Sequence, residues 1–192
     1  TLVKDAPRLI YTSITGFGTD GPYGQWPGYD QIAQGMSGMM SITGQADGLP
    51  TRLGVPLADL VSGIWSSFVT FTALHQRERT GSGQKVATSL LAGVVGMLCV
   101  QGQRYLSLGE IPQRIGNEHP VIYPYGAFEA ADGIINIAAA TQSQWENLCH
   151  LLDLDHLVQQ SEFVDNDARS SHREQLRKIL NSRLCSRSAI EW

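Results

Sequence analysis

Residues 8–18 decide the fold class of this chain, and they read Arg8-Leu-Ile-Tyr-Thr-Ser-Ile-Thr15 followed by Gly16-Phe-Gly18. The first part is rich in β-branched residues and almost continuously apolar, which is typical of a strand covered on both faces. A buried strand that ends in a glycine turn is a common site geometry in α/β proteins. This stretch therefore predicts an α/β fold with a binding site beside the glycine turn.

The longest helix is predicted over residues 57–75, because apolar side chains recur there at helical spacing. These side chains are Leu57, Leu60, Val61, Ile64, Trp65, Phe68, Phe71 and Leu74. The glycines of residues 80–83 suit the end of this helix, and residues 84–88 have the length and β-branching of a second strand. Further helices are predicted over residues 29–40 and 89–108.

Residues 109–116 are polar and rich in turn formers, as a boundary between domains often is. We therefore predict one domain portion over residues 1–108, and a linker with a second domain portion over residues 109–192.

The second portion is predicted to hold a hairpin. Residues 123–129 and 134–139 have strand character, and Asp132-Gly133 in the connection suits a tight turn. Helices are expected over residues 141–152 and 167–185.

Composition excludes several classes of function. The 14 basic and 18 acidic residues are interspersed and give a net charge of −4, so we expect no nucleic-acid partner. The most apolar run, residues 90–100, is well short of the roughly twenty residues that cross a bilayer, and no signal peptide is visible, so we expect no membrane. The three cysteines form no CxxC pair and the five histidines form no HExxH motif. We therefore predict no metal and a reducing compartment.

The best candidate for chemistry is Asp59, in the segment Gly54-Val-Pro-Leu-Ala-Asp-Leu-Val-Ser-Gly63. A carboxylate where a turn enters a helix faces unpaired backbone N–H groups and the positive end of the helix dipole, which hold it in one orientation. The same position suits a nucleophile or an ordinary N-cap, and the residues alone favour the N-cap.

Three stretches resemble the class III CoA-transferases, a group that includes formyl-CoA transferase, carnitine CoA-transferase and α-methylacyl-CoA racemase. They are Ser13-Ile-Thr-Gly-Phe-Gly-Thr-Asp-Gly-Pro22 with Pro27-Gly-Tyr-Asp30, then Gly54 through Gly63, and Arg77-Glu-Arg-Thr-Gly-Ser-Gly-Gln84 with Gly116-Asn-Glu-His-Pro120. The resemblance covers essentially the whole chain. It implies part of a Rossmann-like large domain over residues 1–108, followed by part of a smaller α/β domain. Family members are much longer and form interlocked homodimers, so we expect this chain to be a central piece of such a protein.

The resemblance also implies residue roles. Asp59 matches the family's catalytic aspartate, which attacks an acyl-CoA thioester and passes through a mixed anhydride and an aspartyl-CoA thioester. The resemblance therefore favours the role of nucleophile over that of N-cap for Asp59. Coenzyme A then enters as the acyl-CoA substrate, and its expected contacts are Thr15, Gly16, Phe17 and Gly18. The residues expected to contact the acid substrate are Tyr29, Asn117, Glu118 and His119, with a surface-loop histidine as the alternative for His119.

Other functions stay open at this stage. The racemase branch uses a histidine where this chain has Tyr29, and a phenol is a poor replacement base near neutral pH, which disfavours racemisation. A non-catalytic interaction module with an inherited fold is the second alternative. Members that act on dicarboxylic or carnitine-like acyl groups are the more similar ones, and the candidate carboxylate partners are Arg52, Arg104 and Arg114. We expect a cytoplasmic location, or the mitochondrial matrix in a eukaryote.

Overall fold

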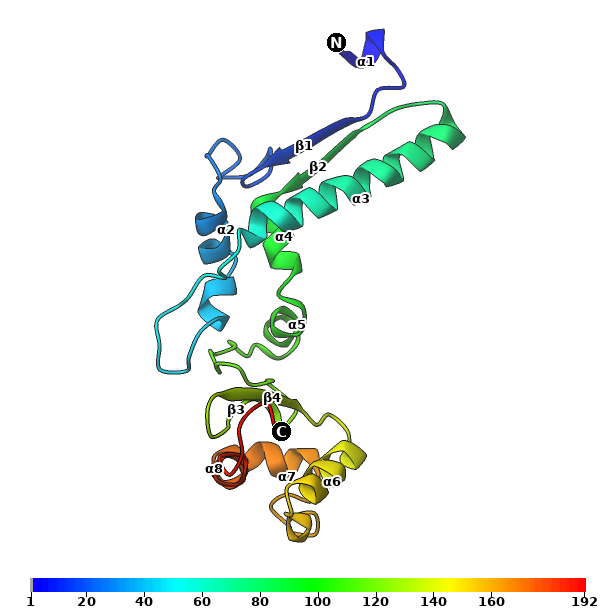
Figure 1. The fold of residues 1–192 in the computed structure, drawn as a ribbon. Coiled ribbons are helices and arrows are strands. Elements are labelled where there is room, and N and C mark those ends of the chain that lie inside the picture. The colour runs from blue at the N-terminus through cyan, green and yellow to red at the C-terminus, as the bar shows by residue number, and fades with distance from the viewer. Residues whose placement is uncertain (1) are drawn as a thin grey trace. The chain divides into compact units, whose positions relative to one another are not determined.

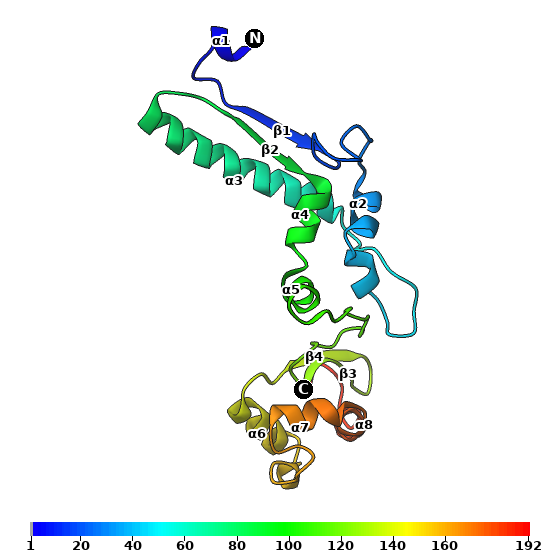
Figure 2. The same cartoon turned by 180° about the vertical axis from the view of Figure 1, so that it is seen from behind.

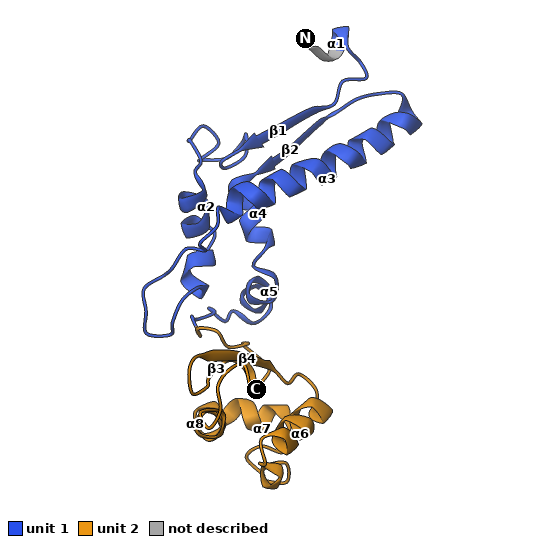
Figure 3. Cartoon of the chain, viewed as in Figure 1, with its two compact units in different colours: residues 1–114 blue, residues 115–192 orange. Residues whose placement is uncertain are grey.

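The structure is a computed structural model that describes residues 2–192, and it divides into two compact units, residues 1–114 and 115–192 (Figure 3). The elements of the first unit are α1 (Leu2–Asp5), β1 (Tyr11–Thr15), α2 (Asp30–Met36), η1 (Met39–Ile42), α3 (Leu57–Thr80), β2 (Lys85–Ser89), α4 (Leu90–Gly96) and α5 (Cys99–Leu108). Those of the second unit are β3 (Tyr125–Glu129), β4 (Ile134–Ala138), α6 (Gln142–Leu151), η2 (Asp155–Leu157), α7 (Asn166–Ser171) and α8 (Arg173–Leu184). The expected boundary after residue 108 falls at the end of α5, six residues before the division between the two units.

The first unit is built on two parallel strands joined by a helical crossover. β1 and β2 pair from Tyr11 opposite Lys85 to Thr15 opposite Ser89. Parallel strands require such a crossover, and α3 supplies it by running back along both strands (Figure 1). Consequently the start of α3 lies at the carboxyl ends of the strands, together with α2 and α4 (Figure 2).

Two glycines that are distant in sequence meet at this end of the strands. A Cβ atom added to Gly16 would lie 2.4 Å from the Cα of Gly28, and one added to Gly28 would lie 2.1 Å from the Cα of Gly16. Neither position has room for a side chain. This contact places the segment before α2 against the turn that follows β1.

Helix α3 has the length and apolar composition needed to cross a membrane, with 28% of its most apolar window buried. The core helix of a soluble protein passes the same test. The buried side of α3 is partly polar, since Ser62 and Ser66 are buried and the hydroxyl of Thr70 lies 2.7 Å from that of Thr12 in β1. The absence of a membrane therefore stays a prediction.

Three helices differ from the sequence-based expectation because each is interrupted. The helix expected over residues 29–40 ends at Met36, since Gly38 adopts a φ of +88° before the short helix η1. The helix expected over residues 89–108 breaks between α4 and α5, next to Cys99 at a φ of +46°. Gly93 weakens α4 but allows a close approach to α3, because a Cβ there would lie 3.2 Å from the Cγ1 of Val61.

The helix expected over residues 167–185 also divides, at His172, into α7 and α8. The division lets α7 bury Arg169, while α8 packs along β3. The Arg169 guanidinium donates to the carbonyl oxygens of Tyr123 (2.9 Å) and Phe163 (3.1 Å) and lies 5.1 Å from the centre of the Trp145 ring. Burial lowers the pKa of Arg169. The contacts with Tyr123 and Trp145 join segments distant in sequence, so the local pattern does not reveal them.

The second unit packs three helices against the antiparallel hairpin of β3 and β4, in which Tyr125 faces Ala138 and Glu129 faces Ile134. Helix α6 begins with a capping box, in which Thr141 accepts from the backbone of Gln144 and the Gln144 side chain accepts from that of Thr141. The core is continuous and consists of Tyr123, Phe128, Trp145, Cys149, Leu152, Leu157, Phe163, Leu176, Leu180 and Leu184. The expected hairpin and the helix over residues 141–152 are both present.

Replacing Gly28 by alanine tests the contact between the two glycines. We expect Gly28→Ala to lower the free energy of unfolding by about 1–3 kcal/mol or more, because the new Cβ would overlap backbone that cannot rotate away. Urea unfolding measures this effect. Gly54→Ala is the matched control, since a Cβ at Gly54 meets no atom within 4 Å. Equal unfolding midpoints for the two variants would contradict the close approach.

Candidate active site

The start of α3 presents Asp59 to solvent. The helix begins at Leu57 after Pro56, and Asp59 is its third residue, with an exposed side chain. Among residues 2–192, no hydrogen bond to the Asp59 carboxylate is present. The N-cap role considered for Asp59 is therefore wrong, because the residue lies inside the helix and caps nothing.

Asp30 from α2 caps α3 instead. Its Oδ1 accepts a hydrogen bond of 2.8 Å from the backbone N–H of Ala58, one of the first N–H groups of the helix. Its Oδ2 accepts a second bond, also 2.8 Å, from the side-chain amide of Gln34, one turn further along α2. A carboxylate from another element thus caps the helix, a role that usually belongs to the residue just before it.

Gln34 extends this cap to the loop before α3. The side chain is fully buried, its Oε1 accepts from the N–H of Leu53 (2.9 Å) and its Nε2 donates to the carbonyl of Val55 (3.3 Å). We call these two residues the Asp30–Gln34 clamp. The clamp fixes the backbone on both sides of Pro56 and so determines where Asp59 emerges.

Neither Asp30 nor Gln34 is among the site residues predicted from the sequence. The available signal was the spacing of Asp30 and Gln34, because residues four apart lie on the same face of a helix. That spacing indicates a pair but not its partner, since Ala58 follows Asp30 by 28 positions.

Three consecutive backbone N–H groups lie at and beside Asp59, and they differ in whether they have an acceptor. The N–H groups of Ala58 and Leu60 are occupied by Asp30 Oδ1 and by the carbonyl of Pro56 (3.1 Å). Within the described part of the chain, the N–H of Asp59 itself meets no acceptor. A free N–H at a helix start attracts negative charge on an oxygen atom.

The predicted coenzyme-binding turn lies at the same end of the strands. The N–H of Gly18 donates to Thr15 Oγ1 (2.9 Å), and the N–H of Leu91, in α4, donates to the carbonyl of Gly16 (3.1 Å). Through its contact with Gly28, this turn lies beside the segment that leads to Tyr29.

Two aromatic residues near this turn are exposed. Tyr29 is 69% exposed and Trp26 is 58% exposed, with Trp26 in edge contact with Tyr23 at 4.9 Å between ring centres. Core packing is the role that the sequence favours for Trp26, and its exposure contradicts that expectation. Tyr29 is accessible to a ligand in this chain.

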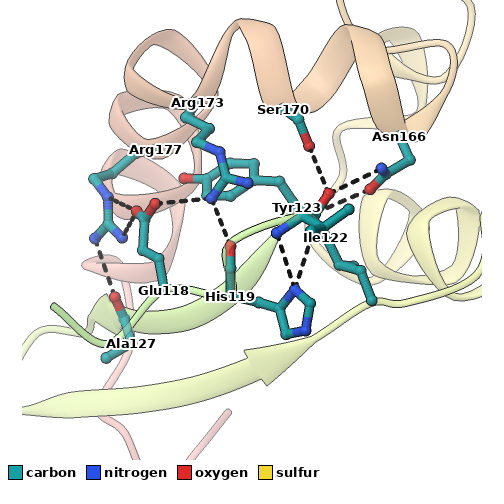
Figure 4. A network of polar contacts seen from close by, with 10 residues as sticks. Glu118, His119, Ile122, Tyr123, Ala127, Asn166, Ser170, Arg173 and Arg177 are labelled. Atoms are coloured by element: carbon teal, nitrogen blue, oxygen red, sulfur yellow. Dashed lines mark hydrogen bonds and ion pairs between the residues drawn. The ribbon is translucent and has the colours of Figure 1, made fainter. Parts of the chain in front are cut away.

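The remaining predicted site residues belong to the second unit, where Glu118 is the centre of a charged network (Figure 4). Its carboxylate accepts from Arg173 Nη1 (3.1 Å) and from Arg177 Nε (3.0 Å), and it also pairs with Arg177 Nη2. Arg177 Nη1 donates to the carbonyl of Ala127 (3.0 Å) in β3. Burial by itself lowers the pKa of Arg177, but hydrogen bonding to Glu118 and its charge outweigh burial and raise it. The guanidinium groups of Arg173 and Arg177 on α8 therefore hold the loop that contains Glu118 and His119.

His119, next in that loop, has a defined tautomer. Its Nδ1 accepts from the N–H groups of Val121 (3.1 Å) and Ile122 (3.0 Å), so the ring proton lies on Nε2. The ring stacks on Tyr125 at 5.0 Å, and Arg173 Nη1 donates to the His119 carbonyl (2.9 Å). Because Nδ1 is occupied, His119 offers a hydrogen-bond donor at Nε2. Asn117, at the tip of the loop, is exposed.

No group of three histidine, cysteine, aspartate or glutamate side chains suitable for a metal ion is found among residues 2–192. The expectation of a metal-free site stays a prediction.

Removing the cap of α3 tests the clamp. Asp30→Ala is expected to lower the free energy of unfolding by about 2 kcal/mol or more, because the helix loses its cap and the buried Gln34 amide loses an acceptor. Urea unfolding followed by tryptophan fluorescence measures the change. Gln31→Ala is the control, since Gln31 is exposed on the same helix. If both variants unfold at the same urea concentration, the clamp does not stabilise the helix start.

Neutralising Glu118 tests the loop network. Glu118→Gln is expected to cost about 1–3 kcal/mol, because two partly buried guanidinium groups lose their countercharge. Hydrogen exchange of the Val121 and Ile122 amides should become faster, since the loop that carries His119 loosens. Glu129→Gln in β3 is the control, since Glu129 is exposed and its side chain makes no ion pair among the described residues. Unchanged exchange in Glu118→Gln would show that the loop is held by other contacts.

Known proteins of one family match this chain. The family model described as CoA-transferase family III matches residues 1–192. Succinate–glutarate CoA-transferase of Agrobacterium fabrum is 42% identical over 92% of this chain and 44% of its own length. Succinyl-CoA:glutarate CoA-transferase of Homo sapiens is 37% identical over 97% of this chain and 43% of its own length.

Solved structures give the same result for the fold. A CaiB/BaiF family protein from Brucella suis matches with a TM-score of 0.82 and 38% identity, over 99% of this chain and 50% of that one. A hypothetical protein from Mycobacterium tuberculosis matches with a TM-score of 0.88 and 30% identity, over 100% of this chain and 51% of that one. The chain spans about half the length of the relatives it matches. It belongs to CoA-transferase family III and has the mixed α/β fold of the CaiB/BaiF proteins.

Proposed function

We propose that the whole protein containing this chain transfers coenzyme A from an acyl-CoA thioester to a carboxylic acid, with Asp59 as the nucleophile. One observation carries the proposal: Asp59 is an exposed carboxylate at a helix start whose capping is done by Asp30. Family membership supports the same chemistry, since the matched relatives are named CoA-transferases.

The reaction proceeds in four balanced steps. An Asp59 carboxylate oxygen attacks the thioester carbonyl carbon, the C–S bond breaks, and CoA thiolate leaves behind a mixed anhydride. The thiolate then attacks the Asp59 carbonyl carbon and expels the donor acid, which gives an aspartyl-CoA thioester. The carboxylate of the acceptor acid attacks this thioester and releases CoA thiolate again. Finally, the thiolate attacks the acceptor's acyl carbon and frees Asp59.

The helix start suits these steps because negative charge develops on a carbonyl oxygen at each attack. A donor fixed in advance stabilises such charge better than water, which must reorient. The free N–H of Asp59 and the positive end of the α3 dipole lie at this position. We assign the role of fixing both groups to the Asp30–Gln34 clamp.

Substrate contacts follow from the accessible side chains. The turn of Thr15, Gly16, Phe17 and Gly18 is assigned to coenzyme A, and Tyr29 to the acyl group. In the second unit, Asn117 and His119 are assigned to the acid, with His119 donating from Nε2. Because two guanidinium groups occupy the Glu118 carboxylate, we infer that Glu118 acts on the substrate through the loop that it holds.

The proposal extends to the whole protein. We infer an interlocked homodimer and a cytoplasmic location, with no nucleic-acid, membrane or metal partner. Several relatives are named for succinate, glutarate or mesaconate, which are dicarboxylic acids. We therefore favour a dicarboxylic acid as one of the substrates.

Replacing Asp59 by asparagine tests the covalent mechanism. In the whole protein, Asp59→Asn should reduce CoA transfer from succinyl-CoA at least about 10⁴-fold, since an amide is a poor nucleophile. The wild-type protein incubated with succinyl-CoA and hydroxylamine should become modified at Asp59, as peptide mass spectrometry detects. Asp47→Asn is the control, because Asp47 is exposed in a loop without hydrogen-bond partners among the described residues.

Wild-type protein that transfers CoA without any modification at Asp59 would exclude the covalent mechanism. Exchange of the α-proton of a 2-methylacyl-CoA with solvent deuterium, at the rate of turnover, would instead support a racemase.

A further inference from the structure

The arginines and lysines of the first unit differ in whether they are free to bind an anionic substrate. Arg104 donates twice to Glu110, at 3.1 and 2.6 Å, and Arg114 donates to the carbonyl of Ser41 (3.1 Å). The Arg104 guanidinium is therefore paired with a carboxylate, and one donor of Arg114 is occupied by the backbone.

Most of the other cations lie far from Asp59. Arg77 and Arg79 are in the last turn of α3, which is roughly 27–30 Å along the helix from Asp59 at 1.5 Å per residue. Arg8 pairs with Glu78 at that same end, and Lys85 begins β2, also at that end of the strands. None of these side chains is positioned to meet a ligand at the start of α3.

Arg52 differs from these cations both in its pairing within the protein and in its location. Its side chain is 46% exposed, and its only charged neighbour within residues 2–192 is the 12% exposed carboxylate of Asp30, with 3.7 Å between Nη1 and Oδ2. That distance is too long for a hydrogen bond, and the two Asp30 oxygens already accept from Ala58 and Gln34. The N–H donors of the Arg52 guanidinium therefore remain available.

The backbone beside Arg52 is fixed. The N–H of Leu53, the next residue, donates to the buried Gln34 side chain (2.9 Å), so the clamp that positions Asp59 also positions Arg52. The same Asp30 carboxylate contacts Arg52 and the N–H of Ala58, the residue before Asp59. A half-exposed guanidinium and the exposed Asp59 thus share one rigid support.

We propose that Arg52 is a specificity-determining residue that binds the second, non-reacting carboxylate of a dicarboxylic substrate. The guanidinium presents paired N–H donors that match the two oxygens of a carboxylate, so it recognises both the charge and the planar shape of the group. A monocarboxylic acid of the same chain length lacks this partner. Discrimination between the two acids then arises from one ion pair beside the reacting centre.

This inference rests on the proposed function, because it concerns the substrate of the same reaction. A purely structural role for Arg52, as the countercharge of Asp30, makes a different prediction. Loss of a structural contact would slow the reaction of every acyl-CoA to the same degree, because it would displace the helix start and Asp59 with it.

The test uses two five-carbon donors, glutaryl-CoA and pentanoyl-CoA, which differ by the terminal carboxylate. The whole protein is incubated with each donor and hydroxylamine, and the rate of Asp59 modification is measured over a range of donor concentrations. In Arg52→Gln, we expect the apparent second-order rate constant for glutaryl-CoA to fall roughly 10- to 100-fold, mostly through weaker binding. The value for pentanoyl-CoA should change less than about 3-fold.

Two further variants sharpen the test. Arg52→Lys keeps the charge but loses the paired donors, so it should recover part of the lost preference. Arg104→Gln removes an arginine that is already engaged by Glu110, and it should leave the preference for glutaryl-CoA unchanged.

Equal slowing with both donors, or no change in Arg52→Gln, would overturn the role of Arg52 while leaving CoA transfer in place. Wild-type protein that is modified at Asp59 by neither of these donors would overturn the role of Arg52, and absence of modification by succinyl-CoA as well would overturn the proposed function itself.

Discussion

The hydrogen bond from the Ala58 N–H to Asp30 is the constraint on which the rest of the first unit depends. A helix start leaves several N–H groups without partners, and a missing cap costs about 1 kcal/mol. Here the cap comes from another helix, so the same bond also fixes α2 against α3. Gln34 adds the loop before α3 to this unit, because its buried amide would be left without partners if the loop moved.

The position of the clamp depends in turn on a backbone contact between two glycines. Gly16 follows β1 and Gly28 lies two residues before the start of α2, and their backbones approach more closely than any Cβ allows. The glycine turn therefore sets the position of Asp30, which in turn sets the start of α3. Because Asp30 provides the cap, the oxygens of Asp59 are not engaged by the backbone and remain available for attack. A carboxylate that both capped the helix and attacked a thioester would have to give up its hydrogen bonds during the reaction.

The sequence predicts those parts of this structure that depend on local periodicity. The strand before Gly16, the long α3 helix, the hairpin around Asp132-Gly133 and the helix after Thr141 all follow from spacing and turn residues. The interruptions at Gly38 and Cys99 are marked instead by positive φ angles, and the one at His172 accompanies the contacts of Arg169 with segments distant in sequence. The capping role was assigned to the wrong aspartate for the same reason, since Asp30 and Ala58 meet only in the folded chain. The catalytic assignment of Asp59 came from resemblance rather than from the residues alone.

The charges at the start of α3 favour the proposed order of the reaction steps. Two unit charges of like sign about 5 Å apart repel each other by roughly 3 kcal/mol at an effective dielectric constant of 20, so an ionised acid approaches an ionised aspartate at a cost. In the proposed sequence the acceptor arrives when Asp59 is a neutral thioester, and Arg52 offsets the charge of Asp30. The covalent intermediate thus removes the main repulsion before the acceptor acid binds. A dicarboxylic acid still carries a second charge at that point, and the half-exposed guanidinium on the same support as Asp59 is where that charge is stabilised.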